Sequence, residues 1–173
     1  MESFGTSGQT GPRTGFQIDE VHEVTPDLID TLVEIDLQTF SESTFSEYAA
    51  AAMLRNGRVY LLSSGDQIIG TCVTMRCWDR PNEAMILSMG IKPGWRGQGL
   101  GQHFIRGVLQ KLRQRGLRSA CLYVGTDNRR AIRVYEDVGF TVVERALGNR
   151  GDRAQLHLLR VTFQDSQPVI ELS

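Results

Sequence analysis

The stretch KPGWRGQGLGQHF, from Lys92 to Phe104, decides the fold of this 173-residue chain. It places glycines at 94, 97, 99 and 101 and then runs into an apolar pattern with the period of a helix. Glycine loses more backbone entropy on ordering than any other residue, so such a cluster is tolerated where the backbone must come close to something else. The stretch therefore predicts a loop followed by a helix over about residues 99–115.

The start of that helix is a candidate phosphate site. A helix N-terminus presents N–H groups without intrahelical partners and a partial positive charge. Gly97, Gly99 and Gly101 allow the backbone N–H groups of residues 96–102 to converge on one anion, and Arg96 and Arg106 can add charge.

Three phosphate-binding interpretations compete with a ligand-free turn. A P-loop requires Lys-Ser or Lys-Thr after the glycines, and the sequence has neither there. A dinucleotide fingerprint requires G-x-G-x-x-G early in a βαβ unit, whereas these glycines have another spacing and follow an expected antiparallel meander. The pyrophosphate of coenzyme A is the interpretation that is left.

The segments around the loop predict an α/β fold, a mixed sheet with helices on its faces. The expected strands cover residues 16–25, 58–64, 67–78, 84–91, 118–125, 141–147 and 153–163. The expected helices cover residues 26–40, 46–57, 99–115 and 128–139, which gives the order β-α-α-β-β-β-α-β-α-β-β. The apolar run 84–91 is typical of a central strand. One domain is expected over residues 16–163, between a disordered arm (1–15) and a C-terminal tail (164–173).

Composition excludes several classes of protein. The net charge of −1 with 40% hydrophobic residues is that of an ordinary globular chain without a nucleic-acid surface. No apolar run is long enough to cross a membrane, and the N-terminus lacks the apolar core of a secretory signal. The three cysteines, Cys72, Cys77 and Cys121, have no CxxC spacing, so we expect buried free thiols, no metal site and a reducing, cytoplasmic setting.

Two motifs together carry a family resemblance. Arg96-Gly97-Gln98-Gly99-Leu100-Gly101 fits the pattern Q/R-x-x-G-x-G/A, and residues 128–140 fit N-x-x-A-x-x-x-Y-x-x-x-G-F. Over residues 61–160 the chain resembles the GNAT superfamily of N-acetyltransferases, in particular its ribosomal-protein-alanine and mycothiol-synthase-like branches.

The resemblance implies a cosubstrate, a reaction and a set of residues. It implies acetyl-CoA, no metal, and transfer of the acetyl group to a primary amine of a small molecule or a peptide N-terminus. The cofactor-binding residues that it implies are Met89, Gly90, Ile91, Arg96, Gly97, Gln98, Gly99, Leu100, Gly101, Gln102, Asn128 and Tyr135. Asn128 is equally suited to cap a helix. Tyr135 is the implied general acid, since a phenol stays protonated at neutral pH; its alternative role is core packing.

The general base, the acceptor and the oligomeric state stay open. In the ribosomal-protein-alanine branch a glutamate stands where this chain has Tyr123, so Glu83, taken as a solvated carboxylate, Ser88 and ordered water remain candidates. Candidate walls of the acceptor pocket are Phe40, Phe45, Tyr48, Trp78, Asp79 and the turn 148–152. Monomer and homodimer are both compatible with the sequence, with no nucleic-acid or membrane partner expected. The alternative function is an acyl-CoA-binding regulatory module without transferase activity.

Overall fold

Seven strands form one mixed sheet in the computed structural model, which describes residues 15–23, 25–39, 46–147 and 155–163. The order of strands across the sheet is β1-β2-β3-β4-β5-β7-β6. The strands are β1 (Phe16–Glu20), β2 (Arg58–Ser64), β3 (Gln67–Arg76), β4 (Glu83–Ile91), β5 (Ser119–Gly125), β6 (Thr141–Leu147) and β7 (Leu156–Thr162). The helices are α1 (Pro26–Thr39), α2 (Glu47–Asn56), α3 (Leu100–Gln114) and α4 (Arg129–Glu136), with a 3-10 turn η1 (Pro93–Trp95) before α3. The predicted order of elements is confirmed.

Each of three helices begins at a polar side chain that caps it. Thr25 Oγ1 accepts the N–H of Leu28 at 3.2 Å, and Pro26 is the first residue of α1. Ser46 and Asn128 cap α2 and α4 in the same way. These caps satisfy N–H groups that have no partner within the helix, so local sequence is enough to fix where these helices start.

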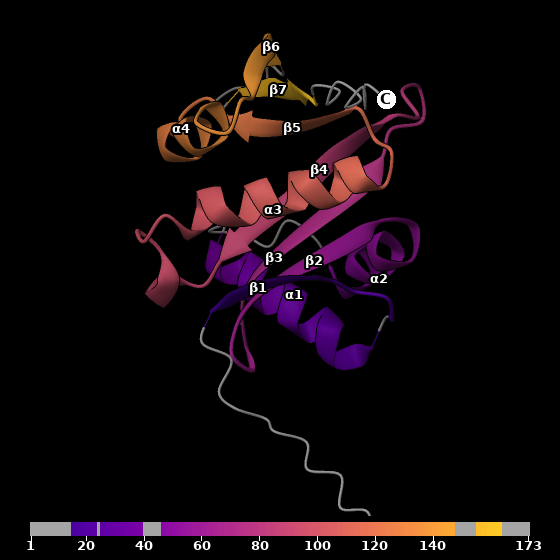
Figure 1. The fold of residues 1–173 in the computed structure, drawn as a ribbon, viewed down its shortest axis with the longest axis vertical. Helices are drawn as coiled ribbons and strands as arrows, with labels where there is room; N and C mark the ends of the chain where they lie inside the picture. Colours follow the sequence, from indigo (N-terminus) through magenta and orange to yellow (C-terminus); the bar gives the residue numbers. More distant parts are fainter. Residues whose placement is uncertain (1–14, 24, 40–45, 148–154, 164–173) are drawn as a thin grey trace, which may run out of the picture.

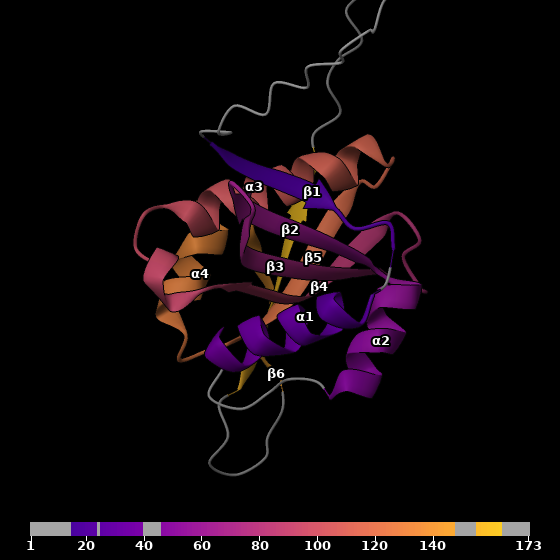
Figure 2. The ribbon, with the colours of Figure 1, turned by 90° about the horizontal axis from the view of Figure 1, so that it is seen from below.

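The helices divide between the two faces of the sheet (Figures 1 and 2). Buried residues of α3, together with Tyr135 of α4, pack in one cluster with Ile86 and Ile91 of β4. Buried residues of α1 and α2 pack in a second cluster with Val73 of β3 and, at its edge, Leu87. The sheet is therefore covered on both sides of β4, as an α/β fold requires.

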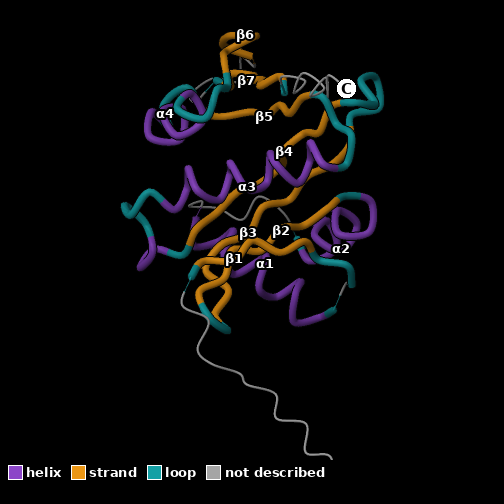
Figure 3. Tube along the Cα trace, in the orientation of Figure 1, coloured by secondary structure: helices purple, strands orange, loops and turns teal. Residues whose placement is uncertain are grey.

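Strand β4 is central, and it is paired on both sides along only part of its length. It pairs antiparallel with β3 as far as Ile91, but its parallel pairing with β5 runs only from Glu83–Ser119 to Ile86–Leu122. Beyond that point the two strands diverge, as the traces in Figures 1 and 3 show, toward the loop before α3 and toward α4. Parallel neighbours that separate leave backbone N–H and C=O groups without a ladder partner. The gap between β4 and β5 is the main irregularity of the sheet.

Two predicted strands end earlier in the structure than expected, and the cause is the same for both. The strand predicted over residues 16–25 ends at Glu20, which pairs with Tyr60, and the N–H of Val21 makes the last hydrogen bond to β2, at Val59. The strand predicted over residues 67–78 ends at Arg76, opposite Ala84, near the start of β4. A strand persists only where a neighbour completes its hydrogen bonds.

The helix predicted over residues 128–139 ends at Glu136, where the N–H of Phe140 returns to the carbonyl of Tyr135. Most of the expected arm (residues 1–15), the tail and the turn 148–152 lie outside the described residues. Within the described part of the chain, no helix combines the length and apolarity needed to span a membrane.

Candidate active site

The glycine loop turns twice through left-handed backbone conformations. Gly97 has φ +82° and Gly99 has φ +75°, and Gly99 is the residue that caps α3. A side chain at these φ values costs about 1–2 kcal/mol, so glycine is needed here for conformation rather than for space. Successive N–H groups around such residues form a concave surface that binds anions.

The N–H groups of residues 97–102 have no hydrogen-bond acceptor within the described residues. The first helical bond of α3 is from the N–H of His103 to the carbonyl of Gly99, so the N–H groups of residues 97–102 precede the ladder. Six unpartnered donors at the start of one helix favour a bound anion, because an unpaired N–H group costs stability when it loses contact with water.

Arg96 has a different place from the one predicted. Its N–H donates to the carbonyl of Pro93, so it does not belong to the set of unpartnered donors. Its guanidinium donates to the carbonyl oxygens of Ile91 and Gln38, both at 2.7 Å. Arg96 therefore fixes the last turn of α1 to the end of β4, and the predicted donor set of residues 96–102 is reduced to residues 97–102.

The free edge of β4 exposes backbone groups of alternate residues. The N–H of Lys92 donates to the carbonyl of Ile69 on β3. Because the backbone N–H and C=O groups of successive residues point to opposite edges of a strand, the backbone groups of Met89 and Ile91 point toward the gap. The carbonyl of Ile91 accepts a hydrogen bond from Arg96, so the N–H of Ile91 is the group that can contact a ligand. Gly90 pairs with Thr71 and lets α1 approach, since a Cβ there would overlap Thr39. The prediction of main-chain contacts thus fits Met89 and Ile91 better than Gly90.

Helix α4 contacts the first turn of α3 through a hydrogen bond and through packing. Gln102 Nε2 donates to Asp137 Oδ2 at 2.6 Å, and Val134 lies next to Gly101. Asn128 Oδ1 accepts the N–H of Ala131 at 3.1 Å, which is the capping role foreseen for it. These contacts bring the second motif of the sequence next to the first.

Tyr135 is buried on the face that α3 and α4 cover. Its ring packs edge-on to Phe140 with ring centroids 5.6 Å apart. Burial, and secondarily the nearby thiol of Cys72, raise the pKa of Tyr135 above its ordinary value. Cys72 is paired with Met89, which lies beyond Ile86, the last residue of β4 that pairs with β5.

Sequence reasoning missed the carboxylate on the other face of β4. Ser88 Oγ donates to Asp36 Oδ1 at 3.2 Å, and both side chains are buried. The two residues are separated by 52 positions, and Asp36 lies in a helical pattern whose other acidic residues are exposed or half-buried. The local signal that could have found it is spacing, since Asp36 stands four residues after Leu32 and eight after Leu28, on the buried stripe of α1.

Glu83 is a buried ion-pair partner, so the expectation of a solvated strand-end carboxylate is wrong. It is 3% exposed, and Arg160 Nε lies 2.6 Å from its Oε2. Burial raises the pKa of Glu83, but hydrogen bonds from Arg160 and Ser119 outweigh burial, and the pKa is lowered. A carboxylate that is already paired and has a lowered pKa is a weak base.

Two cysteines complete this cluster. The ligand atoms of Cys77, Cys121 and Glu83 lie within 4.8 Å of one another. Burial raises the pKa of Cys77, and it raises that of Cys121 to about 12, so both side chains are thiols at neutral pH when no metal is bound. Cys72 and Cys121 are buried as predicted, but Cys77 is half-buried and lies outside β3.

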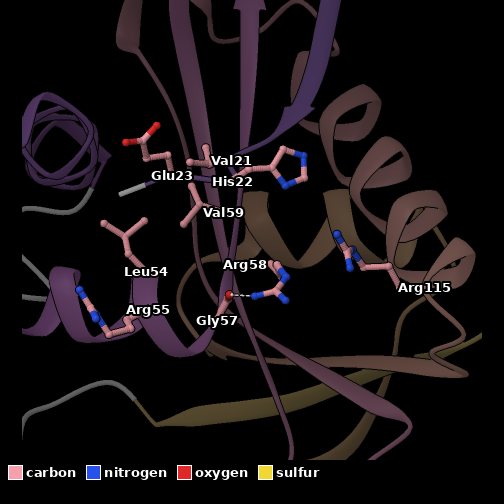
Figure 4. Close-up of a pocket in the computed structure, with 9 residues that line it drawn as sticks. All are labelled: Val21, His22, Glu23, Leu54, Arg55, Gly57, Arg58, Val59 and Arg115. Atoms are coloured by element: carbon pink, nitrogen blue, oxygen red, sulfur yellow. Dashed lines mark hydrogen bonds between the residues drawn. The ribbon is translucent and has the colours of Figure 1, made fainter. Parts of the chain in front are cut away.

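A pocket of about 450 Å³ lies far from the glycine loop (Figure 4). It is bordered by the ends of β1 and α2 and by Arg115, which follows α3. Since α3 has 15 residues, it separates the pocket from the loop by about 22 Å. Glu20 pairs with Arg58 and Arg115, and Arg58 also donates to the carbonyl of Gly57. The single carboxylate of Glu20 is thus shared by two guanidinium groups, and the pocket lies at the opposite end of α3 from the predicted anion site.

Few of the predicted acceptor walls can be placed. Tyr48 is 85% exposed on α2 and Trp78 is 96% exposed after β3. Tyr123, at the position of the family glutamate, is 47% exposed on β5. Phe40, Phe45 and the turn 148–152 lie outside the described residues.

Comparisons of sequence agree with this architecture. The model of the acetyltransferase (GNAT) family matches residues 25–140. The mycothiol acetyltransferase of Corynebacterium efficiens is 34% identical over 96 residues, which cover 56% of this chain and 32% of that protein. The mycothiol acetyltransferase of Saccharomonospora viridis is 46% identical over 56 residues, 32% of this chain and 18% of that protein. The chain thus spans about a third or less of the length of these curated relatives.

Comparisons of structure agree as well. The ribosomal-protein-S18-alanine N-acetyltransferase of Escherichia coli has a TM-score of 0.75 at 18% identity, with 90% of this chain and 99% of that chain covered. A Bacillus subtilis acetyltransferase in complex with CoA has a TM-score of 0.69 at 17% identity, with 87% of this chain and all of that chain covered. At these identities the likeness concerns the fold.

Proposed function

The chain belongs to the GNAT acetyltransferase family, and from that premise we propose that it transfers an acetyl group from acetyl-CoA to a primary amine of a small molecule or a peptide N-terminus. The observation that carries the proposal is the set of unpartnered N–H groups of residues 97–102 beside a strand edge that β5 has left. Together they match a ligand with a pyrophosphate at one end and an amide-bearing arm at the other.

The residues proposed to hold the cosubstrate divide into two groups. The N–H groups of residues 97–102 bind the pyrophosphate, and the main-chain groups of Met89 and Ile91 bind the arm in the gap. Asn128 contributes its side-chain amide, whose nitrogen is a donor that helix capping does not use. Bound acetyl-CoA would supply an activated acetyl thioester at the level of Met89.

Tyr135 is proposed to act as the general acid. Its pKa, raised by burial, keeps the phenol protonated at neutral pH, and Cys72, with which it interacts, pairs with Met89 on the strand proposed to hold the arm. Donation of its proton to the leaving sulfur avoids the release of a bare thiolate in an apolar site. Arg96 is proposed to hold α1 against β4 rather than to bind phosphate.

Release of thiol from acetyl-CoA in the presence of candidate amines tests the proposal. The relatives named for mycothiol and for the alanine of ribosomal protein S18 suggest the first two acceptors: a small-molecule amine of mycothiol synthesis and a peptide that begins with alanine. We expect amine-dependent thiol release with at least one acceptor. Tight binding of coenzyme A without transfer to any amine would instead support the regulatory-module alternative.

A further inference from the structure

Asp36 is a buried carboxylate to which the proposed chemistry assigns no task. It lies on α1, is 2% exposed, and accepts a hydrogen bond from Ser88 Oγ at 3.2 Å. Ser88 itself is 7% exposed. A carboxyl group buried against the central strand, in contact with a serine of that strand, calls for an explanation.

The contact lies where the sheet is open. Ser88 follows Ile86, the last residue of β4 that pairs with β5. Gly90, two residues on, faces α1, since a Cβ there would overlap Thr39. Met89 and Ile91, in contrast, pack in the cluster of α3 and α4. Side chains alternate along a strand, so Ser88 and Gly90 share the α1 face of the gap.

The two faces of the gap have different tasks in the proposed reaction. The glycine loop and Tyr135 belong to the face of α3 and α4, which the cosubstrate would occupy. The acceptor amine must then reach the gap from the face of α1. An aliphatic amine has a pKa of about 10 and arrives as an ammonium ion, which has to lose a proton before its nitrogen can attack. Glu83 is unsuited to take that proton because Arg160 already neutralises it.

We propose that Asp36 is the positioning residue for deprotonation of the acceptor, acting through Ser88. The Ser88 hydroxyl donates to Asp36, so its oxygen lone pairs are free to accept a proton from the ammonium. In the transfer, the N–H bond breaks and a new O–H bond forms at Ser88, while the original Ser88 proton passes to the carboxylate. Ammonium and carboxylate become amine and carboxylic acid, and no other reactant is needed. This inference rests on the proposed transferase function.

The pH dependence of this proton path also depends on the charged groups of the elements that surround Asp36 and Ser88. Lys92 pairs with Glu34 on the exposed side of α1 at 3.6 Å, and Arg96 holds the last turn of α1. Arg76 is at the opposite end of β3, paired with Ala84, and Glu83 begins β4. On α2 the charged side chain whose position is described is Arg55, in its last turn.

The test compares Asp36→Asn with Glu34→Gln, which neutralises an exposed carboxylate on the same helix. Two acceptors that the wild type acetylates are used, one strongly basic and one weakly basic amine that is neutral at the assay pH. With the basic amine, Asp36→Asn should lower kcat/KM at pH 7 by about 100-fold, and the loss should shrink as pH approaches the pKa of the amine. With the weakly basic amine the loss should stay below about threefold, because no proton has to be removed.

A merely structural role predicts another result: equal losses for both amines, with a lower melting temperature and weaker coenzyme A binding. Equal losses, or no loss, would overturn the inference. Ser88→Ala is the second variant in case Asp36→Asn does not fold. It should show the same dependence on pH and amine basicity, and wild-type kinetics in Ser88→Ala would also overturn it. A wild-type chain that acetylates no amine overturns the proposed function, and the proton path with it.

Discussion

The two ends of β4 differ in how their polar groups are satisfied. At the Glu83 end the strand pairs on both sides, and the buried carboxylate is held by Arg160 and Ser119. At the Ile91 end one edge is unpaired, and the N–H groups of residues 97–102 have no acceptor among the described residues. Buried polar groups that satisfy one another stabilise a fold, whereas preorganised donors without partners are available to a ligand. The comparison therefore supports a structural role for one end and the proposed ligand binding at the other.

The largest expected effect is on catalysis at the open end. Tyr135→Phe removes the phenolic hydroxyl but keeps the ring packed on Phe140. We expect turnover to fall by about 10²–10⁴-fold, the usual contribution of a general acid. Coenzyme A affinity, measured by calorimetry, should stay within about twofold, since the variant leaves the loop donors in place. A collapse of affinity with little change in turnover would make Tyr135 a packing residue.

Glu83→Gln should have the next largest effect, and on stability rather than on the reaction. Removing one charge of a buried pair leaves Arg160 uncompensated, for which we expect a loss of about 2–3 kcal/mol in the free energy of unfolding by urea. The pKa of Glu83 is lowered in the fold, so its contribution is present above the unfolded pKa and is lost as pH falls through the folded value. The difference between variant and wild type should therefore shrink below about pH 4.

The activity of the folded Glu83→Gln variant tests whether Glu83 has a structural role and no role in the reaction. Turnover per folded molecule should equal that of the wild type. A large loss of turnover without a loss of stability would make Glu83 the general base and would contradict the assignment of this end of β4 to structure.

A smaller effect is expected from one charge in the loop. Gln98→Glu places a carboxylate beside the unpartnered donors without changing the backbone, and Gln98 is exposed. Coenzyme A affinity should fall about tenfold, or 1.4 kcal/mol, and less at high salt. Gln110→Glu, the same change at an exposed position further along α3, is the matched control and should leave affinity unchanged. Equal effects of both variants would indicate general repulsion rather than a local site.

The smallest effect is expected at the pocket bordered by Arg58 and Arg115. Arg115→Ala breaks a half-exposed pair with Glu20, which keeps Arg58 as a partner, so we expect a loss of about 1 kcal/mol. Thermal unfolding should shift by a few degrees at most, and coenzyme A affinity should not change. A clear loss of affinity would move the anion site from the glycine loop to this pocket.

Sequence reasoning succeeded where the cause is local. The helix at residues 100–114, its glycine cap and the polar caps of α1 and α2 follow from neighbouring residues. The apolar run of β4 also indicated its central place. In each case a propensity or pattern within one segment is sufficient.

The features that were missed are long-range contacts. Ser88 meets Asp36 across 52 positions, Arg96 meets Gln38 across 58, and Glu83 meets Arg160 across 77. Glu83 carries no local mark of the distant partner that it pairs with, which is why it was expected in solvent.

The amide resonances of residues 97–102, followed by NMR while coenzyme A is added, test the central claim most directly. Coenzyme A should shift these resonances strongly, as expected for N–H groups that gain a charged acceptor. Pantetheine, which has no pyrophosphate, should leave them nearly unchanged and perturb Met89 and Ile91 instead. Shifts confined to the region of Gly57, Arg58 and Arg115, with residues 97–102 unaffected, would contradict the account.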